Sequence, residues 1–229
     1  QKLGGTREAV SVGVSVGLKP TDEALHEQVA GFIEDGYARV KIKVKPGRDI
    51  EMLGGLRAAY PNVKFMADAN SAYTLADVAR LRELDALDLT MIEQPLRYDD
   101  FLHHARLQEQ IETPVCLDES IKSEGDTELA LELGSCRVIN IKPGRVGGLG
   151  VSRRIHDMMQ DAGLPVWCGG MLESGIGRAH NVALASLPGF TLPGDISASS
   201  RYWARDIVSP EFVVSDGMMQ VPTGPGIGV

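Results

Sequence analysis

Short apolar runs recur along the chain at nearly regular intervals, and after each run apolar residues return every three or four positions. The short runs are typical of buried strands, whereas the longer spacing is typical of helices that cover a sheet. The pattern predicts strands at 9–16, 39–44, 64–67, 89–92, 115–117, 138–141, 166–168 and 190–192. It predicts helices at 22–34, 49–60, 75–84, 98–110, 124–133, 149–162 and 176–187.

Polar residues stand where five successive strands end, at spacings of 25, 25, 25 and 24 residues: Lys43, Asp68, Glu93, Asp118 and Lys142. Strict alternation of strand and helix requires parallel strands joined by crossovers. An open nucleotide-binding sheet would carry a glycine-rich fingerprint after its first strand, and this chain has none there. A barrel instead presents one functional side chain per strand end at a common mouth. We therefore expect an α/β fold, a TIM-like (β/α)7β barrel of eight parallel strands.

Composition supports a single domain over residues 1–229, since 43% of the residues are hydrophobic and 24% are charged. The net charge of −8 contains no block of like charges, which argues against nucleic acid and against an anionic membrane surface as partners. The longest apolar stretches are shorter than the roughly 20 residues that a membrane span needs. We expect a soluble, cytoplasmic protein.

Three carboxylates, Asp68, Glu93 and Asp118, end neighbouring strands and should lie within reach of one point. Carboxylates that close repel one another and stay partly protonated unless a cation neutralises them. An all-oxygen ligand set favours Mg²⁺ or Mn²⁺ over zinc and leaves positions for a substrate carboxylate. The alternative is that each carboxylate caps a helix or pairs with a surface lysine.

Lysines flank the expected metal site. Lys41 and Lys43 share one face of their strand because residues two apart point the same way. The strands of Lys43 and Lys142 are opposite in an eight-stranded barrel, so these lysines should face each other across the mouth. That arrangement fits a carbon acid held between two bases, with a metal-stabilised enediolate as intermediate. The alternatives are a lysine pair at the barrel rim that offsets the acids, or a Schiff-base lysine, which needs no metal ligands.

Further candidates follow the same strands. Asn70 and Glu119 could orient metal ligands or substrate, although turn and cap roles are equally consistent with their positions. Gly170 and Met171 follow the seventh strand, where bare backbone could receive the acyl or carboxylate group of a substrate or simply form a tight loop. Asp195 follows the expected eighth strand and is interpreted as a structural acid.

At these strand ends the chain resembles the enolase superfamily and its muconate-lactonising subgroup, from about Lys2 to Gly226. The segment 167–177 is further similar to the N-acylamino acid racemase and o-succinylbenzoate synthase family. The motifs that carry the first resemblance are Lys41-Ile42-Lys43, Asp68-Ala69-Asn70, Glu93-Gln94-Pro95, Asp118-Glu119-Ser120 and Asn140-Ile141-Lys142-Pro143.

The resemblance implies residue roles. It makes the three carboxylates ligands of Mg²⁺, with Mn²⁺ or another divalent ion as substitutes, makes Lys43 and Lys142 the paired acid and base, and gives Lys41 a role in supporting Lys43. It implies racemisation of N-acylamino acids, N-succinyl or N-acetyl, by 1,1-proton transfer. The alternatives are syn dehydration to o-succinylbenzoate in menaquinone biosynthesis, or both activities. Dipeptide epimerisation fits less well, because that relative's Asp-x-Asp is here Asp195-Ile196-Ser197.

The family also places an α+β capping domain before the barrel, and we expect this chain to be the barrel without that cap. An inert or non-catalytic barrel domain is therefore the alternative from another functional class. The resemblance further implies a small-molecule carboxylate as substrate and a homo-oligomeric full-length protein.

Overall fold

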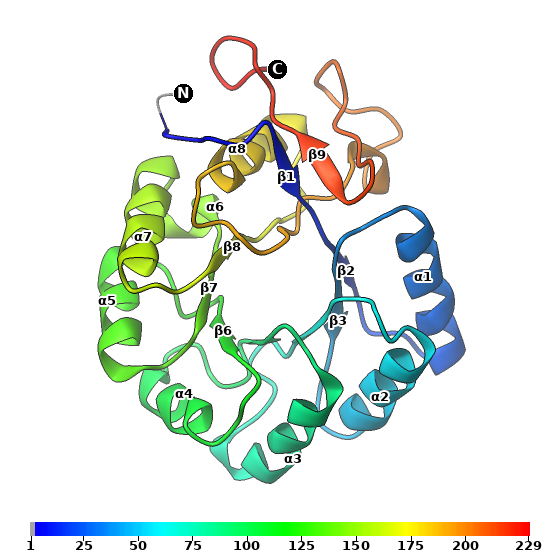
Figure 1. Cartoon of the computed structure of the whole chain (residues 1–229), viewed down its shortest axis with the longest axis vertical. Coiled ribbons are helices and arrows are strands. Elements are labelled where there is room, and N and C mark those ends of the chain that lie inside the picture. The colour runs from blue at the N-terminus through cyan, green and yellow to red at the C-terminus, as the bar shows by residue number, and fades with distance from the viewer. Residues whose placement is uncertain (1–2) are drawn as a thin grey trace.

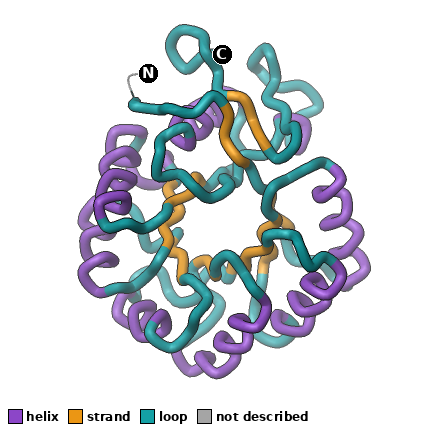
Figure 2. The backbone as a smooth tube through the Cα atoms, viewed as in Figure 1, coloured by secondary structure: helices purple, strands orange, loops and turns teal. Residues whose placement is uncertain are grey.

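The computed structural model describes residues 3–229 and shows a curled parallel sheet inside a ring of helices (Figures 1 and 2). The chain winds around this ring in order, from α1 to α8 (Figure 1). Within the described residues the sheet has seven strands: β2 (Val14–Val16), β3 (Val40–Lys43), β4 (Phe65–Asp68), β5 (Ile92–Glu93), β6 (Val115–Leu117), β7 (Val138–Ile141) and β8 (Val166–Cys168).

Seven of the helices lie at predicted positions, whereas the short α6 was not predicted. The helices on the outer face are α1 (Asp22–Glu34), α2 (Asp49–Ala59), α3 (Val78–Arg82), α4 (Phe101–Gln108), α5 (Glu124–Leu133), α6 (Pro143–Val146), α7 (Leu149–Asp161) and α8 (Gly175–Ala185). Local sequence determines their ends: the Thr21 and Ser123 side chains cap α1 and α5, and Gly134 ends α5 with φ +69°. The predicted helix 75–84 is instead a short α3 between two 3-10 turns, Leu75–Asp77 and Glu83–Leu87.

The predicted first strand, 9–16, is two strands. β1 (Ala9–Ser11) leaves the parallel sheet and pairs antiparallel with β9 (Met218–Gln220), while β2 joins the parallel sheet beside β3. This pairing joins the beginning of the chain to its end, where the hydrophobic pattern predicted no regular element. In β9 only Met219 is buried, so its three residues carry little periodic signal.

The predicted eighth strand at 190–192 is wrong. Pro193 has no amide hydrogen to donate to a neighbouring strand, and the contact shifts to the residues after it. Gly194 donates to the Ser11 carbonyl (3.1 Å) and accepts from Gly13 (2.7 Å), while Asp195 donates to the Cys168 carbonyl (2.9 Å). The bridge between Val12 and Gly194 on the β2 side and the Asp195–Cys168 hydrogen bond on the β8 side, rather than a strand, thus connect the two edges of the curled sheet.

Inside the curl, a small apolar cluster lies below the polar residues that end the strands. It consists of Met66, Met91, Cys116, Val138 and Trp167, all buried. Residues two further along the same strands share this inward face. The two-residue period therefore places Asp68 above Met66, Glu93 above Met91 and Asp118 above Cys116. Among the described residues no helix is both long and apolar enough to span a bilayer.

Candidate active site

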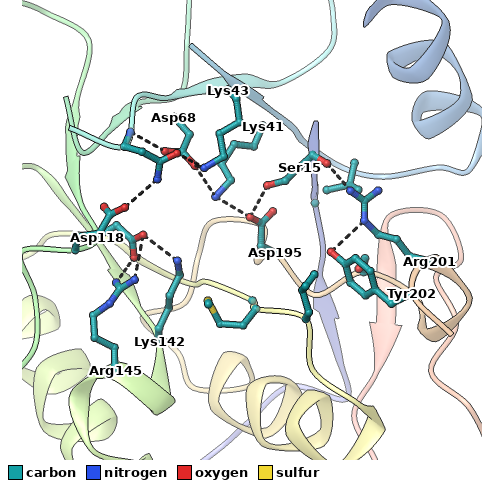
Figure 3. Close-up of a pocket in the computed structure, with 18 residues that line it drawn as sticks. Ser15, Lys41, Lys43, Asp68, Asp118, Lys142, Arg145, Asp195, Arg201 and Tyr202 are labelled. Atoms are coloured by element: carbon teal, nitrogen blue, oxygen red, sulfur yellow. Dashed lines mark hydrogen bonds and ion pairs between the residues drawn. The ribbon is translucent and has the colours of Figure 1, made fainter. Parts of the chain in front are cut away.

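A pocket of about 360 Å³ opens at the carboxyl ends of the strands (Figure 3). Most of the candidate residues line it, including both lysines of β3, Lys142 and two of the three predicted metal ligands. Glu93 lies beneath it, fully buried and bonded to a residue of the pocket wall. The structure therefore brings together the side chains that the strand-end spacing selected.

Lys41 lies at the base of the pocket and joins three carboxylates. Its Nζ is 2.9 Å from Glu93 Oε2, 3.3 Å from Asp68 Oδ2 and 2.8 Å from Asp195 Oδ2. All four side chains are buried or nearly so. Asp68 of β4 and Glu93 of β5 therefore lie close enough together to contact the same ammonium group.

Lys43 lies closer to the pocket opening. Its Nζ is 2.7 Å from Asp68 Oδ2 and also donates to Asn70 Oδ1. The Asn70 amide in turn donates to Glu119 Oε1 at 2.8 Å. Asn70 and Glu119 are therefore found beside Lys43, as side chains of the pocket wall rather than helix caps.

Lys142, directly after β7, binds the third carboxylate, with Nζ 2.8 Å from Asp118 Oδ2. Arg145, on the short helix α6, donates from Nη1 to Oδ1 of the same carboxylate. Figure 3 shows Lys43 and Lys142 entering the pocket from opposite sides. The predicted opposition of the two lysines is thus present, because β3 and β7 are four places apart in the sheet order.

Burial and charge distinguish the carboxylates. Burial raises the pKa of Glu93 to about 8, and nearby Asp68 and Asp118 add to the rise while Lys41 opposes it. Burial alone would also raise the pKa of Asp118, but Lys142 and Arg145 outweigh it and lower that pKa. Burial therefore disfavours the charged form of Glu93, although Lys41 lies next to it.

The residues present fit a hard divalent cation. The donors are all oxygens, and Asp68 and Glu93 are register partners on adjacent strands. Asn140 Nδ2 donates to Glu93 Oε1 at 2.7 Å, while the buried Asn140 Oδ1 has no hydrogen-bond partner among residues 3–229. Among residues 3–229 no group of three Asp, Glu, His or Cys side chains is close enough together to hold a metal ion. The ammonium groups of Lys41 and Lys43 instead contact the carboxylates of Asp68 and Glu93. A divalent cation held by these carboxylates would favour the charged form of the buried Glu93.

Gly170 and Met171 line the same pocket, next to the segment that bridges the sheet edges. A Cβ on Gly170 would lie 1.9 Å from the Asp195 carbonyl oxygen, so only glycine permits this approach. The Met171 side chain is 62% exposed, and its amide donates to Glu173 Oε1 at 2.6 Å. Met171 therefore offers its side chain to the pocket, and its amide already has a partner within the chain.

Sequence reasoning missed several residues of the site. Asn140 and Arg39 precede Lys142 and Lys41 by two positions, so the two-residue period could have indicated both. Arg145 is three positions after Lys142 and carries no strand-end signal. Ser15, Arg201 and Tyr202 also line the pocket, from segments almost 190 residues apart, and no local pattern relates them.

Comparison with known proteins identifies the family of this chain. Residues 24–229 match the family described as enolase C-terminal domain-like. The chain is 56% identical over 228 residues to o-succinylbenzoate synthase of Geobacillus kaustophilus, covering 100% of this chain and 61% of the relative. It is 54% identical over 229 residues to N-succinylamino acid racemase of Thermus thermophilus, covering 100% of this chain and 62% of the relative.

A solved structure shares the fold closely. A member of the enolase superfamily from Listeria innocua superposes with a TM-score of 0.96 at 49% identity, covering 99% of this chain and 61% of that one. The chain thus spans about three fifths of the length of the relatives it matches. From the matched residues 24–229 and this fold, the chain belongs to the enolase C-terminal domain-like family.

Proposed function

We propose that the full-length protein racemises N-acylated amino acids by transferring the α-proton between two lysines. The observation that carries this proposal is the placement of Lys43 and Lys142 on opposite sides of one pocket, with carboxylates between them. A racemase needs an acid and a base on opposite faces of the reacting carbon. The relative from T. thermophilus, which bears the name N-succinylamino acid racemase, supports the same assignment.

Asp68, Glu93 and Asp118 would hold Mg²⁺, or Mn²⁺ or another divalent ion in its place. When bound, the ion supplies positive charge that favours loss of a proton next to the substrate carboxylate. The carboxylates already lie at the ends of adjacent strands, and Lys41 lies within hydrogen-bond distance of two of them.

The two lysines exchange the roles of base and acid between the two directions of the reaction. The neutral amine of one lysine takes the α-proton, so that the C–H bond breaks and an N–H bond forms. The ammonium group of the opposite lysine then gives a proton to the other face of the same carbon, which inverts the configuration. We assign Lys41 to supporting Lys43 from the next inward position of β3, and Asn70 and Glu119 to orienting Lys43.

A second activity, dehydration to o-succinylbenzoate, is favoured by the 56% identity to the G. kaustophilus synthase. In that reaction the neutral amine of Lys43 would remove the proton and then, as an ammonium group, return it to the departing hydroxyl group on the same face, so that the C–O bond breaks and water leaves. Lys142 would stay cationic beside the developing negative charge. The two reactions use the same three carboxylates and the same two facing lysines, so one protein can carry out both. We place dehydration second because it needs only one of the two facing lysines as a proton carrier.

Arg201 is a candidate for binding the acyl group of the substrate. Five cations line the pocket, and within residues 3–229 four of them contact a carboxylate, whereas Arg201 contacts none. Its Nη2 donates to the Ser15 carbonyl (2.5 Å) and its Nε to the Tyr202 hydroxyl (3.1 Å). A guanidinium has five N–H donors, so donors remain for a second carboxylate. This supports N-succinyl over N-acetyl substrates, with Gly170 and Met171 as the neighbouring wall.

Turnover by the full-length protein on an N-succinyl amino acid, its N-acetyl counterpart and the hydrated precursor of o-succinylbenzoate tests this proposal. Solvent-deuterium exchange at the α-carbon, with and without Mg²⁺, adds a readout of proton removal. Exchange that requires the metal is expected. If neither exchange nor dehydration occurred, the reading as a non-catalytic barrel domain would replace ours.

We further propose that residues 1–229 act as the catalytic domain, a (β/α)7β barrel in which Gly194 and Asp195 take the place of the eighth strand. The hydrogen bonds of these two residues to both edges of the sheet support this reading. The homo-oligomeric state of the full-length protein and its cytoplasmic location stay predictions of the sequence.

A further inference from the structure

Asp195 has no role in the proton transfer proposed above, yet it is one of the most heavily bonded side chains of the pocket (Figure 3). Its Oδ2 accepts from Lys41 Nζ and from Ser15 Oγ, both at 2.8 Å. Its Oδ1 accepts from Arg39 Nη1 at 3.0 Å. The side chain is only 10% exposed, so these contacts are made largely out of water.

The backbone fixes the position of this carboxylate. The Asp195 amide donates to Cys168 at the end of β8, and its carbonyl packs against Gly170. Trp167 lies beneath, with its ring 5.0 Å from Lys41 Nζ and 5.1 Å from the Arg39 guanidinium. Lys41 is therefore held between a fixed carboxylate and an aromatic ring, which limits where its ammonium group can go.

Within residues 3–229 Lys41 has three carboxylate partners, of which Asp195 is not a proposed metal ligand. The other two, Asp68 and Glu93, are bonded to the Lys41 ammonium group, which would compete with a cation for these two carboxylates. An ammonium group left without a third partner would stay on these two oxygens and compete with the metal. With Asp195 present, Lys41 keeps a buried anionic partner once a cation is bound.

We propose that Asp195 is a positioning residue: it holds the Lys41 ammonium group on the β8 side of the pocket and so leaves Asp68 and Glu93 available to a divalent cation. The inference rests on the proposed metal site and not on the identity of the reaction. The inference is tested by metal affinity, which can be determined without turnover. A wrong inference about Asp195 is therefore distinguishable from a wrong proposal of racemase activity.

A double-mutant cycle on metal-free full-length protein tests the inference, with Mn²⁺ affinity measured by electron paramagnetic resonance. Asp195→Asn should weaken Mn²⁺ binding by about 10–100-fold, the range typical of residues that orient metal ligands. In a Lys41→Met background the same substitution should have little effect, because no ammonium group is left to position. Equal losses in both backgrounds, or no loss in either, would overturn the inference.

Two further variants guard against a general folding defect. Asp206→Asn removes a similarly buried carboxylate, bonded to Arg178 and Ser199, and should leave Mn²⁺ affinity unchanged. Ser15→Ala removes one hydrogen bond to Asp195 and keeps its charge, so it should weaken Mn²⁺ binding in the same direction by about threefold. If Asp195→Asn does not fold, the effect of Ser15→Ala on Mn²⁺ affinity is the deciding measurement. The positioning role would be refuted if Ser15→Ala left Mn²⁺ affinity unchanged, or if it weakened Mn²⁺ binding equally in the wild-type and the Lys41→Met backgrounds.

Discussion

Lys43 and Lys142 approach one pocket from opposite sides, and each is bonded to a different carboxylate, at 2.7 Å from Asp68 and 2.8 Å from Asp118. Because the two ammonium groups do not share a carboxylate, each lysine is held in place by its own anionic neighbour. This is the arrangement that a two-base racemase requires, and a dehydratase can use it with one lysine held cationic.

Lys43→Ala and Lys142→Ala should each reduce racemisation by about 10²–10⁴-fold, the contribution typical of a positioned acid or base. The lysine that remains should still exchange the α-proton of one enantiomer, which proton NMR in deuterated water would detect. Lys122→Ala, an exposed lysine beside Tyr98, is the control and should keep full activity. Normal turnover in either pocket variant would refute the acid–base assignment.

Removal of divalent metal from the full-length protein should abolish α-proton exchange, and Mg²⁺ should restore it. Metal that binds only the folded state should raise the free energy of unfolding by about 2.7 kcal/mol at 100 times its Kd, visible as a higher Tm. Glu93→Gln should lose most of that increase because it removes a ligand charge. Glu124→Gln, which changes a partly exposed carboxylate paired with Arg154, should respond to Mg²⁺ as the wild type does. A metal-dependent Tm shift retained in Glu93→Gln would argue against this site.

Arg201→Gln should raise the KM for an N-succinyl amino acid by about 10–100-fold, since it removes a charged hydrogen bond to the distal carboxylate. The KM for the matching N-acetyl substrate should stay nearly unchanged, because that substrate has no second carboxylate. Arg205→Gln, an exposed arginine on the same loop, serves as the control. Equal changes for the two substrates would show that Arg201 acts on the fold and not on the acyl group.

Asp49 provides a test of stability away from the pocket. It is 1% exposed, accepts two bonds from Arg80 Nε (2.7 and 3.0 Å) and accepts from the Tyr73 hydroxyl. Asp49→Asn should lower the free energy of unfolding by about 2–3 kcal/mol at pH 7, because buried donors lose a charged partner. Urea denaturation measures this change. Asp99→Asn, in an exposed pair with Arg97, should have far less effect.

The same variant has a predictable pH dependence. Burial alone would raise the pKa of Asp49, but the hydrogen bonds from Arg80 and Tyr73 outweigh it and lower that pKa. The carboxylate therefore stabilises the fold fully above its unfolded-state pKa of about 3.9, and the contribution is lost as pH falls through the lower folded-state pKa. The difference in unfolding free energy between wild type and Asp49→Asn should shrink below that pH. A constant difference down to strongly acidic pH would contradict this explanation.

Gly170→Ala should lower both activity and the free energy of unfolding, the latter by about 1–3 kcal/mol, because its Cβ would overlap the Asp195 carbonyl and force the backbone to move. Gly54→Ala is the matched comparison, since a Cβ there meets nothing within 4 Å inside α2. That substitution should instead stabilise the protein by about 0.5–1 kcal/mol. Denaturation curves that shift the same way for both variants would contradict the close-packing argument.

The sequence alone determined the regular part of this protein. The apolar runs and helical spacings located α1 and α5 at their observed bounds, and the two-residue period put Lys41, Asp68, Glu93 and Lys142 on the inward face. Each of these features depends on neighbours within one strand or helix, where side-chain direction follows directly from backbone geometry. The spacing of about 25 residues then brought the strand ends to a common pocket.

Only the tertiary structure decided how the curled sheet is closed and how the charges are shared. Asp195 meets Ser15 and Arg39, which are 180 and 156 residues away, and Arg201 meets Ser15 across 186 residues. Local periodicity carries no information about such contacts, because they arise where the two ends of the chain meet. The strand predicted at 190–192 is wrong for the same reason: an apolar run was visible, but its hydrogen-bond partners depended on Pro193 and on the distant segment 11–13.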